Sequence, residues 1–378
     1  MNMRIYPFIV IIICLVACTN QSSKYWKPYN ETAELQANQT HENLRMQFQL
    51  IQSKLLDKNE LWSTYEKALN RFGEDQYKAL HPLIIEQDIP TLQSHIKSGL
   101  LSYEKLTLFY LYRIRKLESD PNTTLHAILA LNPMVIEQAK AKDRQKNTQH
   151  HPIFGMPILL KDNINTQDMP TTAGAAFLQS HVPDNDAYIV SQLQAKGALI
   201  LGKVNLSEWA YYFCDGCPLG YSAVGGQTLN PYGRKVFESG GSSSGSGVAV
   251  AANYAVAAVG SETSGSILSP SGHNAVVGCK PTIGLVSRTG IVPISSTLDT
   301  AGPMTKNVID NAILLDAMQG KDTSDPSTTK APDQIGDYIV ASQNRSISGY
   351  RLGAIKSLVK TDSLYRNCLL YTSPSPRD

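Results

Sequence analysis

The residues best suited to chemistry are serines and glycines in two short turns of the chain. All nine residues from 239 to 247 are Ser or Gly, and a second turn of small residues covers 260–266. Between them, the apolar residues 248–252 predict the start of a buried helix, and residues 255–259 predict an apolar strand. Two such turns can bring hydroxyl groups and free backbone N–H groups together, an arrangement that stabilises a developing oxyanion. A flexible linker has a similar composition, but the buried elements that follow argue against one.

Three kinds of site could use turns that are rich in Ser and Gly. Residues 241–245 match the G-x-S-x-G nucleophile elbow, which requires an apolar strand before it and a histidine partner. The preceding residues 232–238 are mostly polar, and His273 is the only histidine that follows. A phosphate-binding loop requires a Gly-Lys-Ser/Thr sequence that does not complete either turn. The remaining kind is a serine activated by a lysine.

A lysine acts as a base only in its neutral form, so its pKa must fall from about 10.4 toward roughly 7–8. Burial of the amine supplies such a shift. Lys161 follows the apolar residues 157–160, which would carry it inward, but Lys203 and Lys280 also follow apolar or small stretches. Hydrophobic patterning therefore leaves three candidate bases, and for any one of them a solvated or paired cation is the simpler interpretation.

Several motifs, taken in order along the chain, resemble those of the amidase signature family. The resemblance covers roughly residues 89–310 and rests on five stretches: 155–162 (GMPILLKD), 202–209 (GKVNLSEW), 240–247 (GGSSSGSG), 260–267 (GSETSGSI) and 299–305 (DTAGPMT). Within the family, residues 205–209 and 222–227 are most similar to the peptide-amidase-like branch.

This resemblance implies an α/β fold in which a mixed β-sheet is flanked by helices on both faces, with a helical extension at the N-terminus. It also implies a Ser–Ser–Lys triad, with Ser266 as the nucleophile, Ser242 as the bridging serine and Lys161 as the base. Ser242 and Ser266 are twenty-four residues apart, as in the family. The peptide bond between Gly241 and Ser242 is expected to be cis. The oxyanion donors are expected to be the backbone N–H groups of Thr263, Ser264, Gly265 and Ser266.

The implied reaction is hydrolysis of a carboxamide C–N bond through an acyl-enzyme, and C-terminal peptide amides are the substrates that the branch suggests. No cofactor and no metal ion are implied. Leu268 departs from the family, because many members carry Arg two residues after the nucleophile. An amidotransferase A-type subunit is therefore a less favoured alternative, and a non-catalytic substrate-binding lipoprotein of the same fold is another.

The elements that must position these motifs alternate between helix and strand, the pattern of an α/β layer. Ser102 is predicted to cap a helix whose apolar face carries Leu106, Tyr110, Ile114 and Leu117. Further elements are predicted as a strand over 124–131, a helix opening at Asn132-Pro133, a helix over 186–196 and a strand over 198–204. Residues 41–75 have a helical pattern, in which Leu44, Phe48, Ile51 and Leu55 recur at spacings of three and four.

The first residues of the chain predict an export signal. Arg4 precedes the apolar run 5–16, which is shorter than the roughly 20 residues of a membrane span and fits a signal peptide. Residues 15–18 (LVAC) resemble the lipobox of bacterial lipoproteins, in which the cysteine is acylated; an ordinary signal peptide or a buried strand is the alternative. We expect an exported protein, lipid-anchored through Cys18 to a bacterial membrane and facing the periplasm or the cell exterior.

Composition limits the remaining functions. The formal net charge is +2 and 17% of the residues are charged, so the chain has no electrostatic footprint for nucleic acid. Cys214 and Cys217 form a C-x-x-C motif that lacks the second pair of ligands of a zinc site. In an exported protein we expect these cysteines to form a disulfide or to remain two ordinary thiols.

We expect four parts along the chain. They are a lipoprotein signal peptide (1–18), a polar tether with accessory helices (19–85), the N-terminal and central part of an amidase domain (86–366) and a tail that resembles nothing in the family (367–378). Family members usually continue well beyond this point. We therefore expect a C-terminally truncated precursor with an incomplete substrate pocket, and the activity of such a fragment stays open.

Overall fold

The computed structural model describes residues 25–146, 148–331, 337–343, 346, 348–349 and 351. The chain divides into two compact units, residues 1–339 and 340–378. All elements discussed below belong to the first unit, except that α11 (Tyr338–Gln343) extends into the second. The predicted signal peptide with Cys18, and the predicted tail 367–378, lie outside the described residues.

A mixed sheet of six strands forms the centre of the first unit, in the order β1-β3-β2-β6-β8-β7. The strands are β1 (Ile128–Leu131), β2 (Pro157–Lys161), β3 (Leu199–Val204), β6 (Ala257–Glu262), β7 (Val277–Gly278) and β8 (Thr300–Thr305). The neighbours β3, β2 and β6 are parallel, whereas β1, β8 and β7 pair antiparallel. Because β2 and β6 are parallel and adjacent, their last residues, Lys161 and Glu262, lie at the same edge of the sheet.

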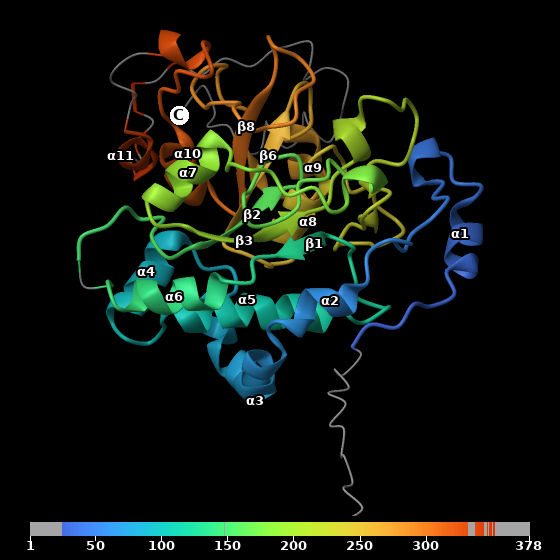
Figure 1. Cartoon of the computed structure of the whole chain (residues 1–378), viewed down its shortest axis with the longest axis horizontal. Helices are drawn as coiled ribbons and strands as arrows, with labels where there is room; N and C mark the ends of the chain where they lie inside the picture. The colour runs from blue at the N-terminus through green and yellow to red at the C-terminus, as the bar shows by residue number, and fades with distance from the viewer. Residues whose placement is uncertain are drawn as a thin grey trace, which may run out of the picture. The chain divides into compact units, whose positions relative to one another are not determined.

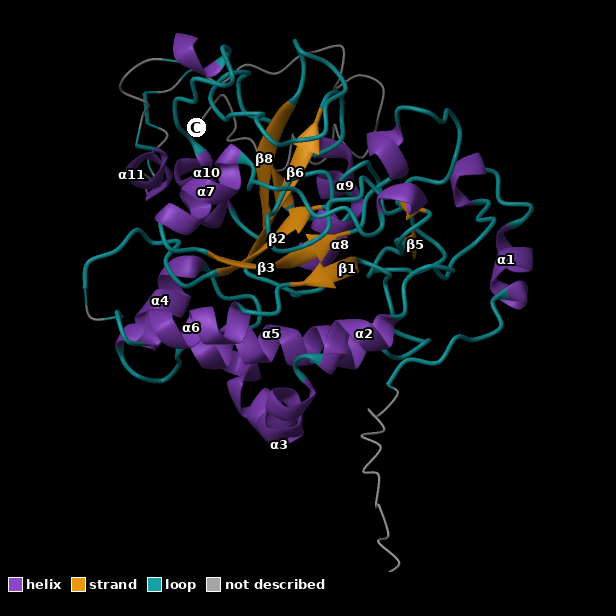
Figure 2. Cartoon of the chain, in the orientation of Figure 1, coloured by secondary structure: helices purple, strands orange, loops and turns teal. Residues whose placement is uncertain are grey.

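Helices flank the sheet on both faces, as predicted (Figure 2). The helix α8 (Ser244–Ala251) packs against β2, β3, β6 and β8, and α9 (Leu268–His273) packs against α8 and β7. Elsewhere α7 (Tyr188–Ala195) contacts β3 and α10 (Val308–Met318), which contacts β8. The helices α4 (Ile89–Lys97), α5 (Tyr103–Glu118) and α6 (Val135–Asp143) lie together near β1 and β3 (Figure 1).

The helix α8 begins inside the Gly/Ser run rather than after it. All eight of its residues are buried, including Ser244, Gly245, Ser246 and Gly247. A Cβ atom on Gly245 would lie 2.4 Å from the carbonyl oxygen of Asn205, closer than side-chain carbons approach backbone. The glycines of this run therefore allow the helix to pack directly on the residues that follow β3, so the run is a packed structural element and not a linker.

Most predicted elements are present with shifted ends. Ser102 caps α5 by accepting a 3.1 Å hydrogen bond from the Lys105 N–H group. Of the predicted strand 124–131, only the residues of β1 form a regular strand. The strand predicted over 255–259 is β6, which begins at Ala257 and continues to Glu262, where it pairs with Thr300 of β8. The helix expected at Asn132-Pro133 begins two residues later, since the Asn132 side chain accepts from the Met134 N–H group and forms a turn there.

The helical pattern predicted from Leu44 to Leu55 is wrong. Leu44 and Leu55 are exposed, whereas Ile51 is buried in an irregular segment. The carbonyl oxygen of Ile51 accepts a 2.8 Å hydrogen bond from the Gln227 N–H group. Pairing of this backbone with the residues 226–227 therefore replaces a helix. The helices of this region are α1 (Thr32–Asn38), the 3₁₀ helix η1 (Leu44–Met46), α2 (Lys58–Ser63) and α3 (Glu66–Ile84).

The remaining short elements are β4 (Tyr221–Ser222), β5 (Gly226–Gln227), η2 (Ala176–Leu178), η3 (Glu208–Tyr211) and η4 (Thr328–Lys330). Among the described residues, none of the helices combines the length and the apolar character that crossing a membrane requires.

Candidate active site

Lys161, the last residue of β2, is completely buried and ends in a cluster of serines. Its Nζ atom donates a 2.7 Å hydrogen bond to Ser242 Oγ. It also donates to the hydroxyl and the carbonyl oxygen of Ser261, at 2.9 and 3.1 Å. The contact that was expected between the lysine and the bridging serine is therefore present.

Burial lowers the pKa of Lys161 to about 7, against the weaker opposing influence of the nearby Glu262 and Asp299 carboxylates. Desolvation disfavours the charged ammonium, and this effect exceeds the attraction of the two acids. An amine with a pKa near neutrality is partly unprotonated at physiological pH, which is the form that accepts a proton.

The other two candidate lysines point elsewhere. Lys203 is equally buried, but its Nζ atom lies 3.3 Å from Asp162 Oδ1 and donates a 2.8 Å hydrogen bond to Thr171 Oγ1. Burial also lowers the pKa of Lys203, opposed by the charge of Asp162. Lys280 is partly exposed and donates a 2.6 Å hydrogen bond to the Thr263 carbonyl oxygen. Of the three, only Lys161 contacts Ser242.

Ser242 lies in a tight turn just before α8. The Gly241–Ser242 peptide bond is cis, as predicted. Ser242 is buried, and its carbonyl oxygen accepts a 3.0 Å hydrogen bond from the Ser207 N–H group. A Cβ atom on Gly241 would lie 2.6 Å from Ser207 Oγ, so only glycine fits before Ser242 without a shift of its neighbours.

Ser266 and Ser242 line the same cavity, which has a volume of about 400 Å³. The Ser243 N–H group donates a 3.1 Å hydrogen bond to the Ser266 carbonyl oxygen, so the turn that carries Ser242 also fixes the backbone of Ser266. Thr263, Ser264 and Gly265 line this cavity too. The predicted nucleophile, bridging serine and oxyanion turn therefore line one cavity, but the structure records no hydrogen bond between the Oγ atoms of Ser242 and Ser266.

The oxyanion turn is organised by Glu262, which the sequence interpretation did not use. Its buried carboxylate accepts hydrogen bonds from the N–H groups of Gly265, Ile267 and Leu268, at 2.7, 2.6 and 3.0 Å. A buried carboxylate requires such donors, and charge-assisted bonds of this kind are strong. The expectation that the Gly265 N–H group binds the oxyanion is therefore corrected, because that group already donates to Glu262.

The N–H groups of Thr263, Ser264 and Ser266 have no hydrogen-bond acceptor among the residues that the structure describes. They remain candidates for binding the oxyanion.

Two further residues of the site were not predicted from the sequence. Ser261 Oγ accepts a hydrogen bond from Lys161 Nζ, and Asn163 Nδ2 donates a 2.9 Å hydrogen bond to the same oxygen. Ser261 lies within the quoted motif 260–267, whereas nothing in the sequence marked Asn163.

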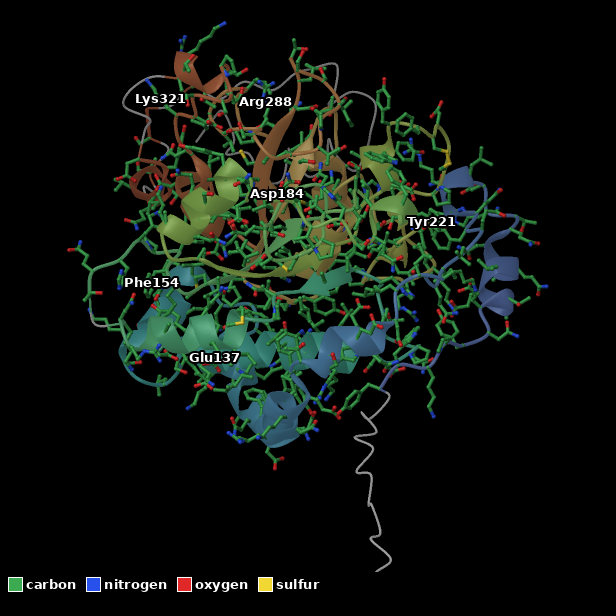
Figure 3. All side chains as sticks on the ribbon, viewed as in Figure 1. Glu137, Phe154, Asp184, Tyr221, Arg288 and Lys321 are labelled. Carbon is green, nitrogen blue, oxygen red and sulfur yellow. A yellow bond between two sulfur atoms is a disulfide. The ribbon has the colours of Figure 1, made fainter. Side chains whose placement is uncertain are left out.

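Two more hollows adjoin the serine cavity, since Ala210 and Ile294 line all three. One, of about 400 Å³, has an aromatic wall formed by Trp209, Tyr212 and Phe213. The other, of about 250 Å³, is edged by Arg288 (labelled in Figure 3), whose guanidinium pairs with Asp325 at 2.6 Å.

Cys214 and Cys217 form a disulfide in the loop directly after Phe213. This is one of the two states expected from the sequence. Within the described ranges, no group of three or more His, Cys, Asp or Glu side chains could hold a metal ion.

The sequence pattern of the family described as Amidase matches residues 105–367. A probable amidase of Arabidopsis thaliana is 43% identical over 279 residues, which cover 72% of this chain and 54% of the plant protein. The A-type subunit of the glutamyl-tRNA(Gln) amidotransferase of Exiguobacterium sibiricum is 39% identical over 258 residues, which cover 68% of this chain and 51% of that protein.

Two solved structures are similar in fold and sequence. An amidase family protein from Bacillus anthracis has a TM-score of 0.73 and 41% identity, covering 76% of this chain and 58% of that protein. The native peptide amidase from Stenotrophomonas maltophilia has a TM-score of 0.65 and 47% identity, covering 68% of this chain and 53% of that protein. The chain spans about half the length of the curated relatives it matches.

Proposed function

The chain belongs to the amidase family, and we propose on that basis that it is a serine amidohydrolase that hydrolyses a carboxamide to a carboxylic acid and ammonia or an amine. The observation that carries the proposal is the 2.7 Å contact between the buried Lys161 Nζ and Ser242 Oγ, at an amine whose pKa is lowered to about 7. A buried lysine that has hydrogen bonds but no direct ion pair is costly for a fold and useful for proton transfer.

In the proposed reaction, neutral Lys161 accepts the proton of Ser242, which in turn accepts the proton of Ser266. Ser266 Oγ then attacks the carbonyl carbon, and the N–H groups of Thr263, Ser264 and Ser266 bind the resulting oxyanion. The C–N bond breaks as the proton returns along the same relay to the leaving nitrogen. Water then attacks the acyl-enzyme, the relay takes its proton, and the acid leaves with Ser266 restored.

C-terminally amidated peptides are the proposed substrate class. Support comes from the similarity to a solved peptide amidase and from the aromatic wall beside the serine cavity, which suits an apolar side chain. The test is ammonia release by the full chain from amidated peptides, fatty amides and aryl amides. We expect the peptides to be the best substrates. Faster hydrolysis of fatty or aryl amides would overturn the substrate class.

Ser266→Ala should abolish ammonia release, and Ser180→Ala, at an exposed serine outside the cavities, is the matched control. A chain that binds amides but releases no ammonia from any of them would instead be a binding protein of the same fold.

The similarity to A-type subunits of amidotransferases reflects shared ancestry in this proposal. Leu268, where many members carry Arg, supports an independent amidase.

The protein is further proposed to be an exported lipoprotein, acylated at Cys18. The support is in the sequence alone: Arg4, the short apolar run 5–16 and the small residues before Cys18. Expressed in a bacterium, the full chain should fractionate with membranes and be released by detergent but not by salt. A Cys18→Ala form should lose this association, and a Cys18→Ala form that stays in the membrane fraction would contradict acylation there.

A further inference from the structure

Arg45 brings a positive charge from the N-terminal segment to the serine cavity. It is the middle residue of η1, and it lines the cavity of about 400 Å³ together with Ser242 and Ser266. Among the residues that the structure describes, every other residue that lines this cavity is uncharged. A single cation in the lining of a cavity whose other lining side chains are uncharged favours ligands of negative charge.

The segment that carries Arg45 is held in place by the loop that leads into the Gly/Ser run. Asn43 Nδ2 donates a 3.2 Å hydrogen bond to Glu238 Oε2. Asn38 Nδ2 donates to the carbonyl oxygens of Met46 and Lys235, at 3.0 and 3.2 Å. Arg45 is therefore fixed at its backbone, and the N-terminal segment is part of the wall around the site.

The guanidinium of Arg45 has donors to spare. Arg45 forms a loose ion pair with Glu238, whose Oε1 atom lies 3.8 Å from Nη1, too far for a hydrogen bond, and the ring of Tyr211 lies 5.9 Å from the central carbon of the guanidinium. The side chain is 44% exposed. The structure records no hydrogen bond from this guanidinium to any described residue, although arginine carries five N–H donors in a planar fork that matches a carboxylate.

Arg288, the arginine of the neighbouring hollow, differs in this respect. It donates to both carboxylate oxygens of Asp325, at 2.9 and 2.6 Å, and to Ser327 Oγ at 2.6 Å. The N–H donors of Arg288 are therefore occupied by the protein itself. Arg45, which lines the cavity of Ser266, has only the loose ion pair with Glu238 and keeps its N–H donors for a hydrogen-bonding ligand.

We propose that Arg45 binds a carboxylate of the substrate, so that the preferred substrates are acidic amides: peptide amides with an Asp or Glu side chain close to the scissile carboxamide. This inference rests on the proposed amidase function. Arg45 acts here as a specificity-determining residue, and it takes no part in the proton relay.

The test measures kcat/KM of the full chain on matched peptide amides that differ only by Asp or Asn, or by Glu or Gln, in the last two residues. We expect the acidic member of at least one pair to be preferred about tenfold, the size of one charge-assisted bond made on binding. Arg45→Gln should bring that ratio to about one, Arg45→Lys should retain part of it, and Arg45→Glu should reverse it.

Arg71→Gln removes the same charge from an exposed position in α3 and is the control, for which the ratio should stay that of the wild type. Thermal unfolding of each variant checks that the fold is kept. The inference would be overturned if the wild type hydrolysed the acidic and the neutral peptide of every pair with the same kcat/KM. It would also be overturned if Arg45→Gln and Arg45→Glu left the ratio of the two kcat/KM values unchanged. Either result would leave the amidase function intact. Failure to hydrolyse any amide would instead contradict the proposed function.

Discussion

The Nζ atom of Lys161 lies 2.7 Å from the Oγ atom of Ser242, although the two residues are eighty-one positions apart in the sequence. Two features of the fold create this contact. The parallel pairing of β2 with β6 places Lys161 at one edge of the sheet, and α8 packs on β2 so that the turn before it reaches the same edge. The contact depends on both elements, so its chemistry is a property of the tertiary structure.

The pH dependence of catalysis should follow Lys161. Its pKa is about 7, and only the neutral amine accepts a proton, so kcat/KM should rise with pH through about 7 and then level off. Below that pH the rate should fall by about tenfold per pH unit. The measurement is kcat/KM on an uncharged amide between about pH 5 and pH 9. A flat profile, or one that falls as the pH rises through 7, would contradict the assignment of Lys161 as the base.

The stability of the fold should also depend on the titration of Lys161. The pKa of Lys161 is about 7 in the folded state and about 10.5 in the unfolded state, so between these values the unfolded chain binds more protons and stability rises with pH. Lys161→Met removes this titration. The free energy of unfolding of the wild type relative to Lys161→Met should therefore increase from pH 7 to pH 9. The measurement is urea unfolding of both proteins at each pH. If the difference between their unfolding free energies did not change from pH 7 to pH 9, the amine of Lys161 would not be desolvated.

Glu262 should affect both the oxyanion turn and the base. Its charge raises the pKa of Lys161, so Glu262→Gln should lower that pKa further and move the acidic limb of the rate profile to lower pH. The variant also loses charge-assisted bonds to the N–H groups of the turn, which should reduce the plateau of kcat/KM by roughly 10–100-fold. A limb that stays in place or moves to higher pH would show that Glu262 does not act on Lys161 through its charge.

Lys203 and Asp162 should behave as a structural pair. Both are buried, 3.3 Å apart, and neither contacts Ser242. Lys203→Met leaves the Asp162 carboxylate without its cation and should cost about 3–5 kcal/mol of unfolding free energy. The double variant Lys203→Met with Asp162→Asn should recover much of this loss, as measured by urea unfolding. If the loss of unfolding free energy in the double variant equalled the sum of the losses in the two single variants, the two groups would not be coupled.

The alternation of helices and strands predicted the α/β class, and the resemblance to the amidase signature family implied the residues that converge on the site. The sequence could not choose among Lys161, Lys203 and Lys280 from patterning alone. All three follow apolar or small residues, and what distinguishes them is the neighbour that each meets in space: Ser242, Asp162 or the Thr263 carbonyl oxygen.

The features that sequence reasoning missed are those that depend on distant segments. The spacing from Leu44 to Leu55 resembles a helix, but backbone pairing with the residues 226–227 overrides it. That same misread segment delivers Arg45 to the cavity. The Gly265 N–H group is a different case, because its acceptor Glu262 is only three residues away and the family resemblance that assigned the group to the oxyanion does not specify this local hydrogen bond.

Covalent labelling of the full chain with a fluorophosphonate, a reagent that modifies activated serines, tests the central claim most directly. Peptide mapping by mass spectrometry should find a single adduct on Ser266, which is lost in Ser266→Ala. Lys161→Ala should slow the labelling by about 10²–10⁴-fold, the range of general-base contributions. Lys78→Ala, at an exposed lysine of α3 far from the serine cavity in the fold, should label at a rate close to that of the wild type. An adduct on Ser242 or on any other serine, or labelling that does not depend on Lys161, would contradict the account.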